Sequence, residues 1–256
     1  MKRIITANVN GIRAAEQKGF FDWIKIQNAD VICLQETKAQ ENQLDERFYP
    51  KEYHCYYQSA KKKGYSGTAI FTKQVPIQVI KKSPWENINF EGRFIRADFE
   101  DLSVISIYIH SGSVKQKRQD LKMAFLTERF MPYLQEIKIS GRKVIICGDM
   151  NIVHQERDIK NWKANQKNSG CLPKERAWLD ELFFEVGFID SFREVNQEER
   201  QYTWWSNRGQ AWANNVGWRI DYQILTPNLK DTIKSVSIYK DERFSDHAPL
   251  IINYNL

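Results

Sequence analysis

The chain has 256 residues, of which 42% are hydrophobic, and it can bury a full core within one domain. Lysine and arginine number 38 against 32 aspartate and glutamate residues, and this net charge of +6 favours a polyanionic partner. The chain opens on Lys2-Arg3-Ile4-Ile5, without the apolar core of a signal peptide, and no run approaches the ~18 apolar residues of a membrane span. We therefore expect a cytoplasmic protein with no membrane partner.

Short apolar segments rich in β-branched residues predict a series of strands. They lie at 3–9, 30–35, 67–72, 94–99, 102–109, 143–147, 222–225, 232–238 and 250–254. Apolar residues spaced three and four apart predict helices at 19–27, 116–139 and 173–186, the second of them kinked or divided at Pro132. So many strands are too many for one doubly wound sheet, and neighbours 94–99 and 102–109 resemble an antiparallel hairpin. We expect a mixed α/β fold in which two packed sheets are flanked by helices.

Polar side chains stand at one end of several predicted core strands. They are Asn8, Glu36, Tyr108, Asp149 with Asn151, Asp221, and Asp246 with His247. A rim of polar groups held on buried strands is a common way to keep an active site rigid. In an extended chain Asp149 and Asn151 share a face, although such a pair taken alone is more typical of a turn.

The residue types in this set narrow the chemistry. The chain has no Cys or Ser beside a convincing base, no P-loop and no paired-histidine zinc motif. Glu36 with Asn8 or Asn10 would suit one Mg²⁺ that keeps several waters. Asp221 would orient His247 toward a phosphate, while Asp149 takes or positions the proton of a water molecule. The pattern indicates metal-assisted hydrolysis of a phosphodiester.

Each of these residues also has a structural interpretation. Glu36 suits a surface helix cap, Tyr108 suits an ordinary sheet tyrosine, and Asp221 suits an ion pair with Arg219. The other histidines, His54, His110 and His154, have no obvious charged partner. These structural interpretations nevertheless explain one polar residue at a strand end more easily than they explain several such residues together.

Three segments mix cations with aromatic or amide side chains. Residues 61–65, 115–118 and 160–163 offer lysines and arginines for phosphates together with rings or amides for bases and sugars. Each segment could equally be a solvated loop. Their shared composition favours nucleic acid as the partner.

Five motifs follow one another along the chain. They are Asn8-Val-Asn-Gly11, Leu34-Gln-Glu-Thr-Lys38, Gly148-Asp-Met-Asn151, Trp218-Arg-Ile-Asp-Tyr222 and Ser245-Asp-His-Ala-Pro249. In this order they resemble the exonuclease III family of apurinic/apyrimidinic endonucleases, and the resemblance extends over residues 2–254. It implies a four-layered α/β sandwich of the DNase I-like type, formed by a single domain of residues 1–256.

The resemblance also implies roles for the metal-binding and water-activating positions. Glu36 would be the metal-ligand glutamate, with Asn8 close to a Mg²⁺ ion that Mn²⁺ could replace. Asp246 would help to bind the metal or act in catalysis on the leaving group. Asp149 would activate or position the attacking water, and Asn151 would orient Asp149 and the scissile phosphate.

Further roles concern the phosphate and the sugar. His247, oriented by Asp221, would contact the phosphate, and Tyr108 would touch the phosphate or assist the leaving oxygen. Trp204 and Trp218 would form the aromatic wall that receives an extruded abasic sugar, because flipping costs least where the base is missing.

Other positions would contact DNA outside the catalytic group. Asn165 and Asn168 resemble phosphate and site contacts of the family. Arg208 and Trp212 would insert into a groove, although an exposed loop is an equally good interpretation.

Four positions depart from the family pattern. Asn10 stands where many relatives have aspartate, Ser111 replaces an asparagine of some branches, His110 stands where proline is frequent, and Trp204 fills a place often held by phenylalanine. None removes a central catalytic group, but each bears on metal affinity and on the balance between endonuclease and exonuclease activity.

The implied function is abasic-site endonuclease activity. The enzyme would cleave 5′ to the lesion, leave a 3′-hydroxyl, and act as a 3′–5′ exonuclease and 3′-end-trimming enzyme on double-stranded DNA with abasic sites or 3′ ends. We expect a bacterial-type monomer that works on the nucleoid. Two alternatives share the motifs: a phosphoinositide or sphingomyelin phosphodiesterase, which the basic and aromatic segments disfavour, and a catalytically silent DNA-binding module, which the intact polar set disfavours.

Overall fold

Two six-stranded β-sheets pack face to face in the computed structural model, which describes residues 1–112 and 116–256. The first sheet, in the order β13-β14-β1-β2-β4-β3, consists of β1 (Lys2–Asn8), β2 (Val31–Gln35), β3 (His54–Gln58), β4 (Thr68–Thr72), β13 (Ile233–Ile238) and β14 (Leu250–Tyr254). The second, in the order β5-β6-β7-β8-β12-β9, consists of β5 (Gln78–Ile80), β6 (Phe94–Asp98), β7 (Leu102–Tyr108), β8 (Lys143–Asp149), β9 (Ile189–Asp190) and β12 (Asp221–Leu225). A further two-stranded sheet pairs β10 (Trp204–Trp205) with β11 (Gly217–Trp218).

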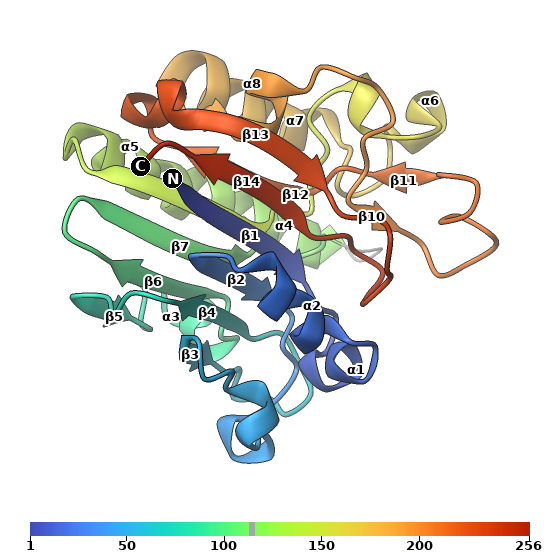
Figure 1. Ribbon diagram of the computed structural model, residues 1–256. Helices are drawn as coiled ribbons and strands as arrows, with labels where there is room; N and C mark the ends of the chain where they lie inside the picture. The colour runs from blue at the N-terminus through green and yellow to red at the C-terminus, as the bar shows by residue number, and fades with distance from the viewer. Residues whose placement is uncertain (113–115) are drawn as a thin grey trace.

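Helices cover the outer faces of both sheets. The α-helices of the described residues are α1 (Ile12–Gln17), α2 (Phe20–Gln27), α3 (Glu86–Phe90), α4 (Gln116–Phe125), α5 (Met131–Ile139), α6 (Trp162–Asn165), α7 (Pro173–Asp180) and α8 (Ser191–Val195). Of these, α8 contacts β12 and β13 of the two sheets, and its Phe192 lies in the cluster between them. The apolar faces of α1 and α2 pack on the first sheet, and those of α5 and α7 pack on the second. The predicted sandwich of two mixed sheets flanked by helices is thus confirmed (Figure 1).

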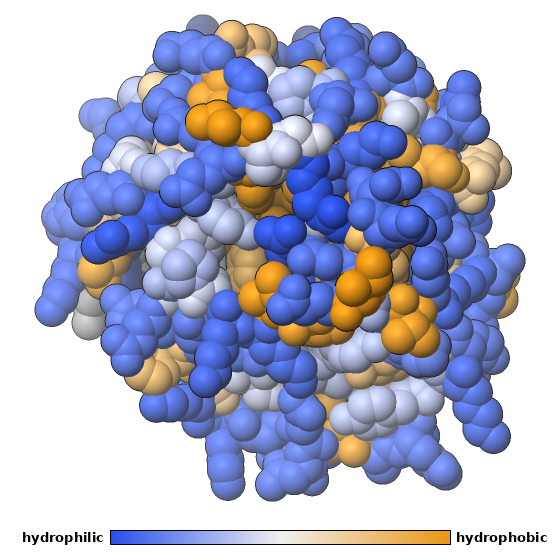
Figure 2. All heavy atoms as spheres, turned by 90° about the vertical axis from the view of Figure 1, so that its left-hand side faces the viewer, coloured by the Kyte–Doolittle hydropathy of each residue, from blue (hydrophilic) through white to orange (hydrophobic). Residues whose placement is uncertain are grey.

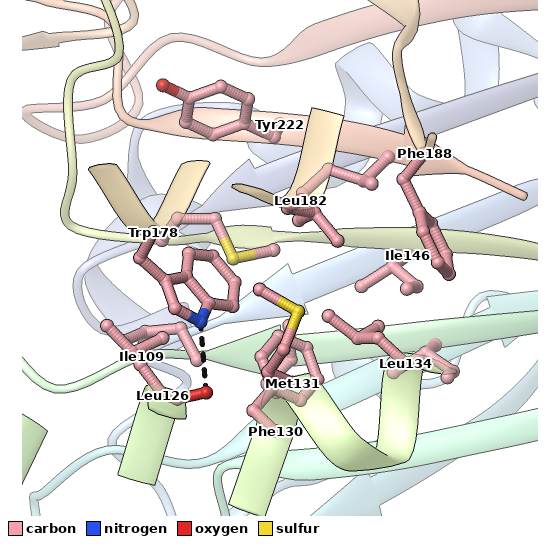
Figure 3. Close-up of a cluster of buried hydrophobic side chains, with 14 of the residues drawn as sticks. Ile109, Leu126, Phe130, Met131, Leu134, Ile146, Trp178, Leu182, Phe188 and Tyr222 are labelled. Atoms are coloured by element: carbon pink, nitrogen blue, oxygen red, sulfur yellow. Dashed lines mark hydrogen bonds between the residues drawn. The ribbon is translucent and has the colours of Figure 1, made fainter. Parts of the chain in front are cut away.

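Three apolar clusters fill the spaces between these layers. Ile4, Cys33, Ile145 and other residues of both sheets form the cluster between them. Outside the second sheet, Trp178 stacks on Phe130 with ring centroids 5.9 Å apart. Its indole Nε1 donates a hydrogen bond of 3.0 Å to a helix carbonyl (Figure 3). Each such buried side chain contributes about 1.5–3 kcal/mol by leaving water.

Two of the predicted long helices change their winding. The helix predicted over 116–139 exists, but its middle, Leu126–Phe130, is π-helical and separates α4 from α5. Pro132 stands in the first turn of α5, where its missing N–H costs least. The helix predicted over 173–186 likewise ends in a π-helical segment, Glu181–Val186, which Gly187 terminates with a φ of 90°.

Strand direction brings the polar strand ends together. β1 is parallel to β2 and β7 is parallel to β8, so all four finish at one end of the sandwich. β12 runs antiparallel to β8 and begins at that end, with Asp221 opposite Asp149. Tyr108 is in register with Asp149 on the other side. The common rim expected from the sequence is therefore a consequence of sheet topology.

The other end of the sandwich carries both termini (Figure 1). Figure 2 shows that end as a mainly hydrophilic surface with smaller apolar patches. In the described part of the chain, no helix has the length and apolar character required to cross a membrane.

Candidate active site

A pocket of about 670 Å³ opens where β1, β2, β7 and β8 finish. The sequence-predicted site residues that line it are Glu36, Tyr108, Asp149, Asn151, Asn168, Trp204, Trp218, Asp246 and His247. Asn8 and Asp221 lie buried directly behind this lining, through hydrogen bonds to Asp149 and His247. The residues predicted from separate strands thus meet in one place.

Asn8 joins the two carboxylates at the base of the pocket. Its Nδ2 donates hydrogen bonds of 2.9 Å to Oε1 of Glu36 and 2.9 Å to Oδ2 of Asp149, while its Oδ1 accepts from the backbone N–H of Asn10. Asn8 therefore acts here as a donor that holds both carboxylates. Its role as a metal ligand stays a prediction.

Glu36 occupies a strained position directly after β2. Its φ of 53° is a left-handed conformation that costs a residue of this kind about 1–3 kcal/mol, and the backbone N–H of Gly11 holds it by donating to the Glu36 carbonyl at 2.7 Å. The ammonium of Lys38 lies 2.7 Å from Glu36 Oε2. Burial alone would raise the pKa of Glu36, but Lys38 and Asn8 outweigh it and lower that pKa below its usual value. Glu36 is thus a carboxylate at neutral pH and not a helix cap.

Asp221 orients His247. The Nδ1 atom of His247 lies 2.9 Å from Asp221 Oδ2, and its Nε2 faces Asp149 Oδ2 at 3.9 Å. Burial would lower the pKa of His247, but the Asp221 carboxylate outweighs it and raises that pKa to about 10. An imidazolium therefore faces the pocket. The alternative interpretation, an ion pair between Asp221 and Arg219, is wrong. Arg219 pairs instead with Asp158 at 2.8 Å and with Asp190 at 2.7 Å.

Asp149 is held as an acceptor. The backbone N–H of Asn151 donates to its Oδ1 at 2.8 Å, and the Asn151 side chain donates to the carbonyl of Ile109 at 2.9 Å. Burial, followed by repulsion from Asp221, raises the pKa of Asp149 to about 8. The segment is a tight turn, as the structural interpretation suggested, and the same turn places Asp149 and Asn151 in the pocket lining.

Glu36 and Asp149 place two carboxylates where they could hold a divalent cation. Their oxygens and a ring nitrogen of His247 lie within 4.8 Å of one another, but the protonated ring would not coordinate the ion. Asp246, predicted as a further ligand, also lines the pocket. Its Oδ1 accepts from Asn10 Nδ2 at 2.7 Å and its Oδ2 accepts from the indole of the wall residue Trp204 at 3.0 Å.

Tyr108 presents a neutral phenol to the pocket. Burial and the nearby carboxylates of Glu36 and Asp149 raise the pKa of Tyr108 well above 10. The guanidinium of Arg93 lies 4.4 Å from the ring centroid. Tyr108 can therefore donate a hydrogen bond into the pocket, in addition to its place in the sheet.

Trp204 and Trp218 form one wall of the pocket. They are paired across β10 and β11, with ring centroids 5.9 Å apart and planes at 89°. Asn168 lies in the lining, and Asn165 lies beside it, accepting a hydrogen bond from the Asn168 amide at 2.8 Å.

Arg208 and Trp212 lie outside this pocket, in the connection between β10 and β11 that extends from the sandwich (Figure 1). Trp212 packs on Trp205 with centroids 4.3 Å apart and lies under the guanidinium of Arg243. Arg208 is exposed. Of the basic segments, Lys115 lies outside the described residues.

Sequence reasoning missed several partners in and near the site. His110 Nε2 lies 3.2 Å from Glu91, and His154 Nε2 lies 2.8 Å from Asp180, so the expectation that these histidines lack charged partners was wrong. Lys122 of α4 is buried behind the pocket, although a lysine in a helix normally predicts a solvated position.

Comparison with known proteins extends the similarity to the whole chain. The profile of the Endonuclease/Exonuclease/phosphatase family matches residues 5–247. The chain is 44% identical to an exodeoxyribonuclease of Bacillus subtilis, over 98% of this chain and 99% of that protein. It is 36% identical to the DNA repair nuclease APEX1 of Danio rerio, over 98% of this chain and 81% of that protein. The structure of an AP endonuclease from Archaeoglobus fulgidus superimposes with a TM-score of 0.90 at 29% identity, covering 100% of both chains.

Proposed function

Because the chain belongs to the endonuclease/exonuclease/phosphatase family, we propose that it is a DNA repair nuclease that hydrolyses the phosphodiester 5′ to an abasic site. The resemblance to apurinic/apyrimidinic endonucleases is confirmed by its relatives, and the chain is a hydrolytic enzyme. Similarity to an exodeoxyribonuclease and to a 3′ phosphatase from Neisseria supports a second activity of the same site, the removal of nucleotides and blocking groups from 3′ ends. The observation that carries the proposal is the convergence of Glu36, Asp149 and the Asp221–His247 pair on one pocket.

Asp149 is the group that takes the proton of the attacking water. Its oxygens accept from the Asn151 N–H and from Asn8. Burial and the Asp221 carboxylate raise its pKa to about 8, so the carboxylate form that takes the proton increases as the pH rises toward that value. The water oxygen forms a bond to phosphorus, and the bond from phosphorus to the 3′ oxygen breaks. Tyr108, which its raised pKa keeps protonated, donates a hydrogen bond to that leaving oxygen, and the oxygen takes its proton from a solvent water molecule. The products are a 3′-hydroxyl and a 5′-phosphate on the abasic sugar.

Positive charge at the pocket offsets the charge that builds on the phosphate oxygens. The imidazolium of His247 faces the pocket with its Nε2, while Asp221 holds the other nitrogen. A divalent cation held at Glu36 supplies further neutralisation when bound. We propose Mg²⁺ for this position, with Mn²⁺ able to replace it, because hard oxygen donors predominate.

The pocket wall supports selection of a sugar without a base. Trp204 and Trp218 offer two ring surfaces to an extruded sugar, and the cost of extrusion is lowest where no base must be unstacked. Double-stranded DNA containing abasic sites or 3′ ends is therefore the proposed partner. We further propose that the protein acts on it as a monomer, in the cytoplasm.

The test compares cleavage rates on three duplexes: an internal abasic analogue, a 3′-recessed end and a 3′-phosphate, each with and without Mg²⁺. We expect metal-dependent cleavage of all three, with the abasic strand cut on its 5′ side. A phosphoinositide and sphingomyelin are measured in parallel. Turnover of a lipid without cleavage of any duplex would overturn the proposal in favour of the lipid phosphodiesterase.

A further inference from the structure

A buried lysine and glutamate form an ion pair directly behind the pocket. Lys122 of α4 and Glu175 of α7 have no exposed side-chain surface, and Lys122 Nζ lies 2.5 Å from Glu175 Oε1. Removing both charges from water is costly unless further hydrogen bonds compensate. The backbone groups that hydrogen-bond to Lys122 and Glu175 therefore show which segments this ion pair holds in place.

Glu175 holds the loop that precedes α7. Its Oε2 accepts from the backbone N–H of Gly170 at 2.7 Å and of Leu172 at 3.0 Å. Gly170, at a φ of 90°, lies close to Trp218 of the pocket wall and to the turn at residues 149–151, here called the catalytic turn. A Cβ on Gly170 would lie 2.9 Å from the Asn151 carbonyl and 3.0 Å from the ring of Trp218. The loop is thus seated against both.

Lys122 holds the catalytic turn itself. Its Nζ donates a second hydrogen bond of 2.9 Å to the backbone carbonyl of Asn151. Asn151 has a left-handed φ of 52°, and its N–H donates to Asp149 Oδ1. The Lys122 ammonium therefore links Asn151, which positions Asp149, to Glu175, which positions the loop at 170–172 beside Trp218.

We propose that Lys122 and Glu175 are positioning residues for hydrolysis, which set the place of the Asn151 turn, and with it Asp149, relative to the wall residue Trp218. The inference rests on the proposed function, because it concerns the same reaction. It predicts an effect on turnover that is separable from folding, since the pair touches the turn without lining the pocket.

The decisive variant is the double substitution Lys122→Met with Glu175→Gln. It is nearly isosteric and removes both charges together, so that no unpaired ion is left buried. The introduced glutamine side chain would still offer an oxygen to the N–H groups of Gly170 and Leu172, whereas methionine cannot donate to the Asn151 carbonyl. The matched control is Lys230→Met with Glu194→Gln, which removes a half-exposed ion pair of 3.2 Å away from the pocket.

We expect the double variant to fold, by circular dichroism and thermal unfolding, and to bind an uncleavable abasic duplex with unchanged Kd. Its kcat on the cleavable duplex should fall by about 10- to 100-fold, because small displacements of a catalytic group cost that much. The control pair should keep the wild-type kcat. A folded double variant with wild-type kcat would overturn the inference, and so would a loss that only tracks the unfolded fraction.

If the double variant does not fold, Lys122→Arg provides the measurement, because it leaves no unpaired ion buried. It keeps a cation for Glu175 but moves the donor that reaches the Asn151 carbonyl, so we expect the same direction of change in kcat with unchanged Kd. Wild-type kcat in this folded variant would equally overturn the inference. A wild-type protein that cleaves no duplex would instead contradict the proposed function.

Discussion

His247 and Asp221 form a hydrogen bond of 2.9 Å that connects the two sheets at the pocket. Asp221 begins β12 of the second sheet, and His247 lies in the segment that leads into β14 of the first. Both side chains are buried, so the carboxylate acts on the imidazole with little screening by water. The charge state of the site therefore depends on how the two sheets are packed.

Asp221→Asn should lower both the pKa of His247 and the rate of cleavage. Asp221 raises that pKa to about 10, so the histidine is charged at neutral pH, and an amide would no longer stabilise the imidazolium. We expect kcat at pH 7.5 to fall by about 10²- to 10⁴-fold. An NMR titration of the imidazole in metal-free protein checks the shift, and an unchanged pKa would contradict the assigned pairing.

Asp149→Asn should separate binding from chemistry. The amide cannot take a proton from water, so we expect cleavage to fall by about 10²- to 10⁴-fold while Kd for an abasic duplex changes little. Asp22→Asn, at an exposed position of α2, is the matched control. Near-wild-type turnover of the Asp149 variant would remove this residue from the mechanism.

Removal of the divalent cation by chelation should abolish DNA cleavage. We expect excess EDTA to abolish cleavage and Mg²⁺ or Mn²⁺ to restore it, with Glu36→Gln needing a higher metal concentration for half-maximal activity. The measurement is the initial rate against metal concentration for both proteins. Full activity in excess EDTA would show that hydrolysis proceeds without the ion.

Trp204→Phe should test the hydrogen bond from the wall to Asp246. Phenylalanine keeps a ring surface but has no indole N–H, so one oxygen of Asp246 loses its 3.0 Å donor. Loss of a hydrogen bond to a charged group is worth about 1.5–3 kcal/mol, and we expect abasic cleavage to fall by about 10-fold or more. The rate ratio between the abasic and 3′-recessed duplexes checks whether the change is specific to one substrate. Equal rates of variant and wild type on both duplexes would show that this bond does not matter.

Asp158→Asn should destabilise the fold in a pH-dependent way. Burial alone would raise the pKa of Asp158, but Arg219 and Arg193 outweigh it and hold that pKa far below 3.8. A depressed pKa stabilises the native state above the unfolded-state value near pH 4, and this contribution fades as the pH falls toward the native-state value. We expect a loss of roughly 3–5 kcal/mol at pH 7 that shrinks below about pH 4. Urea unfolding at pH 7 and pH 3 measures both differences, and a constant difference would contradict the pairing.

The local interactions of the chain were sufficient to predict most of the central strands. β2 and β8 contain continuous apolar runs, and β1 and β7 are rich in apolar β-branched residues although Thr6, Ser103 and Ser106 are buried in them. Strands of this composition that are buried on both faces need little more to be recognised. β3 and β5 were missed because their half-exposed, mixed polarity has no clear period, and the two-residue strands β9 to β11 exist only through their partners.

The sequence by itself determined which polar residues stand at the ends of the buried strands, because each of them adjoins its own apolar run. Only the tertiary structure decided their partners. Arg219 pairs with Asp158, which is 61 residues away, and not with Asp221, which is two residues along the chain. Lys122 pairs with Glu175 across 53 residues. Such pairs depend on how the two sheets and their outer helices pack. No local pattern encodes that packing, because propensity acts over a few residues and burial acts over the whole fold.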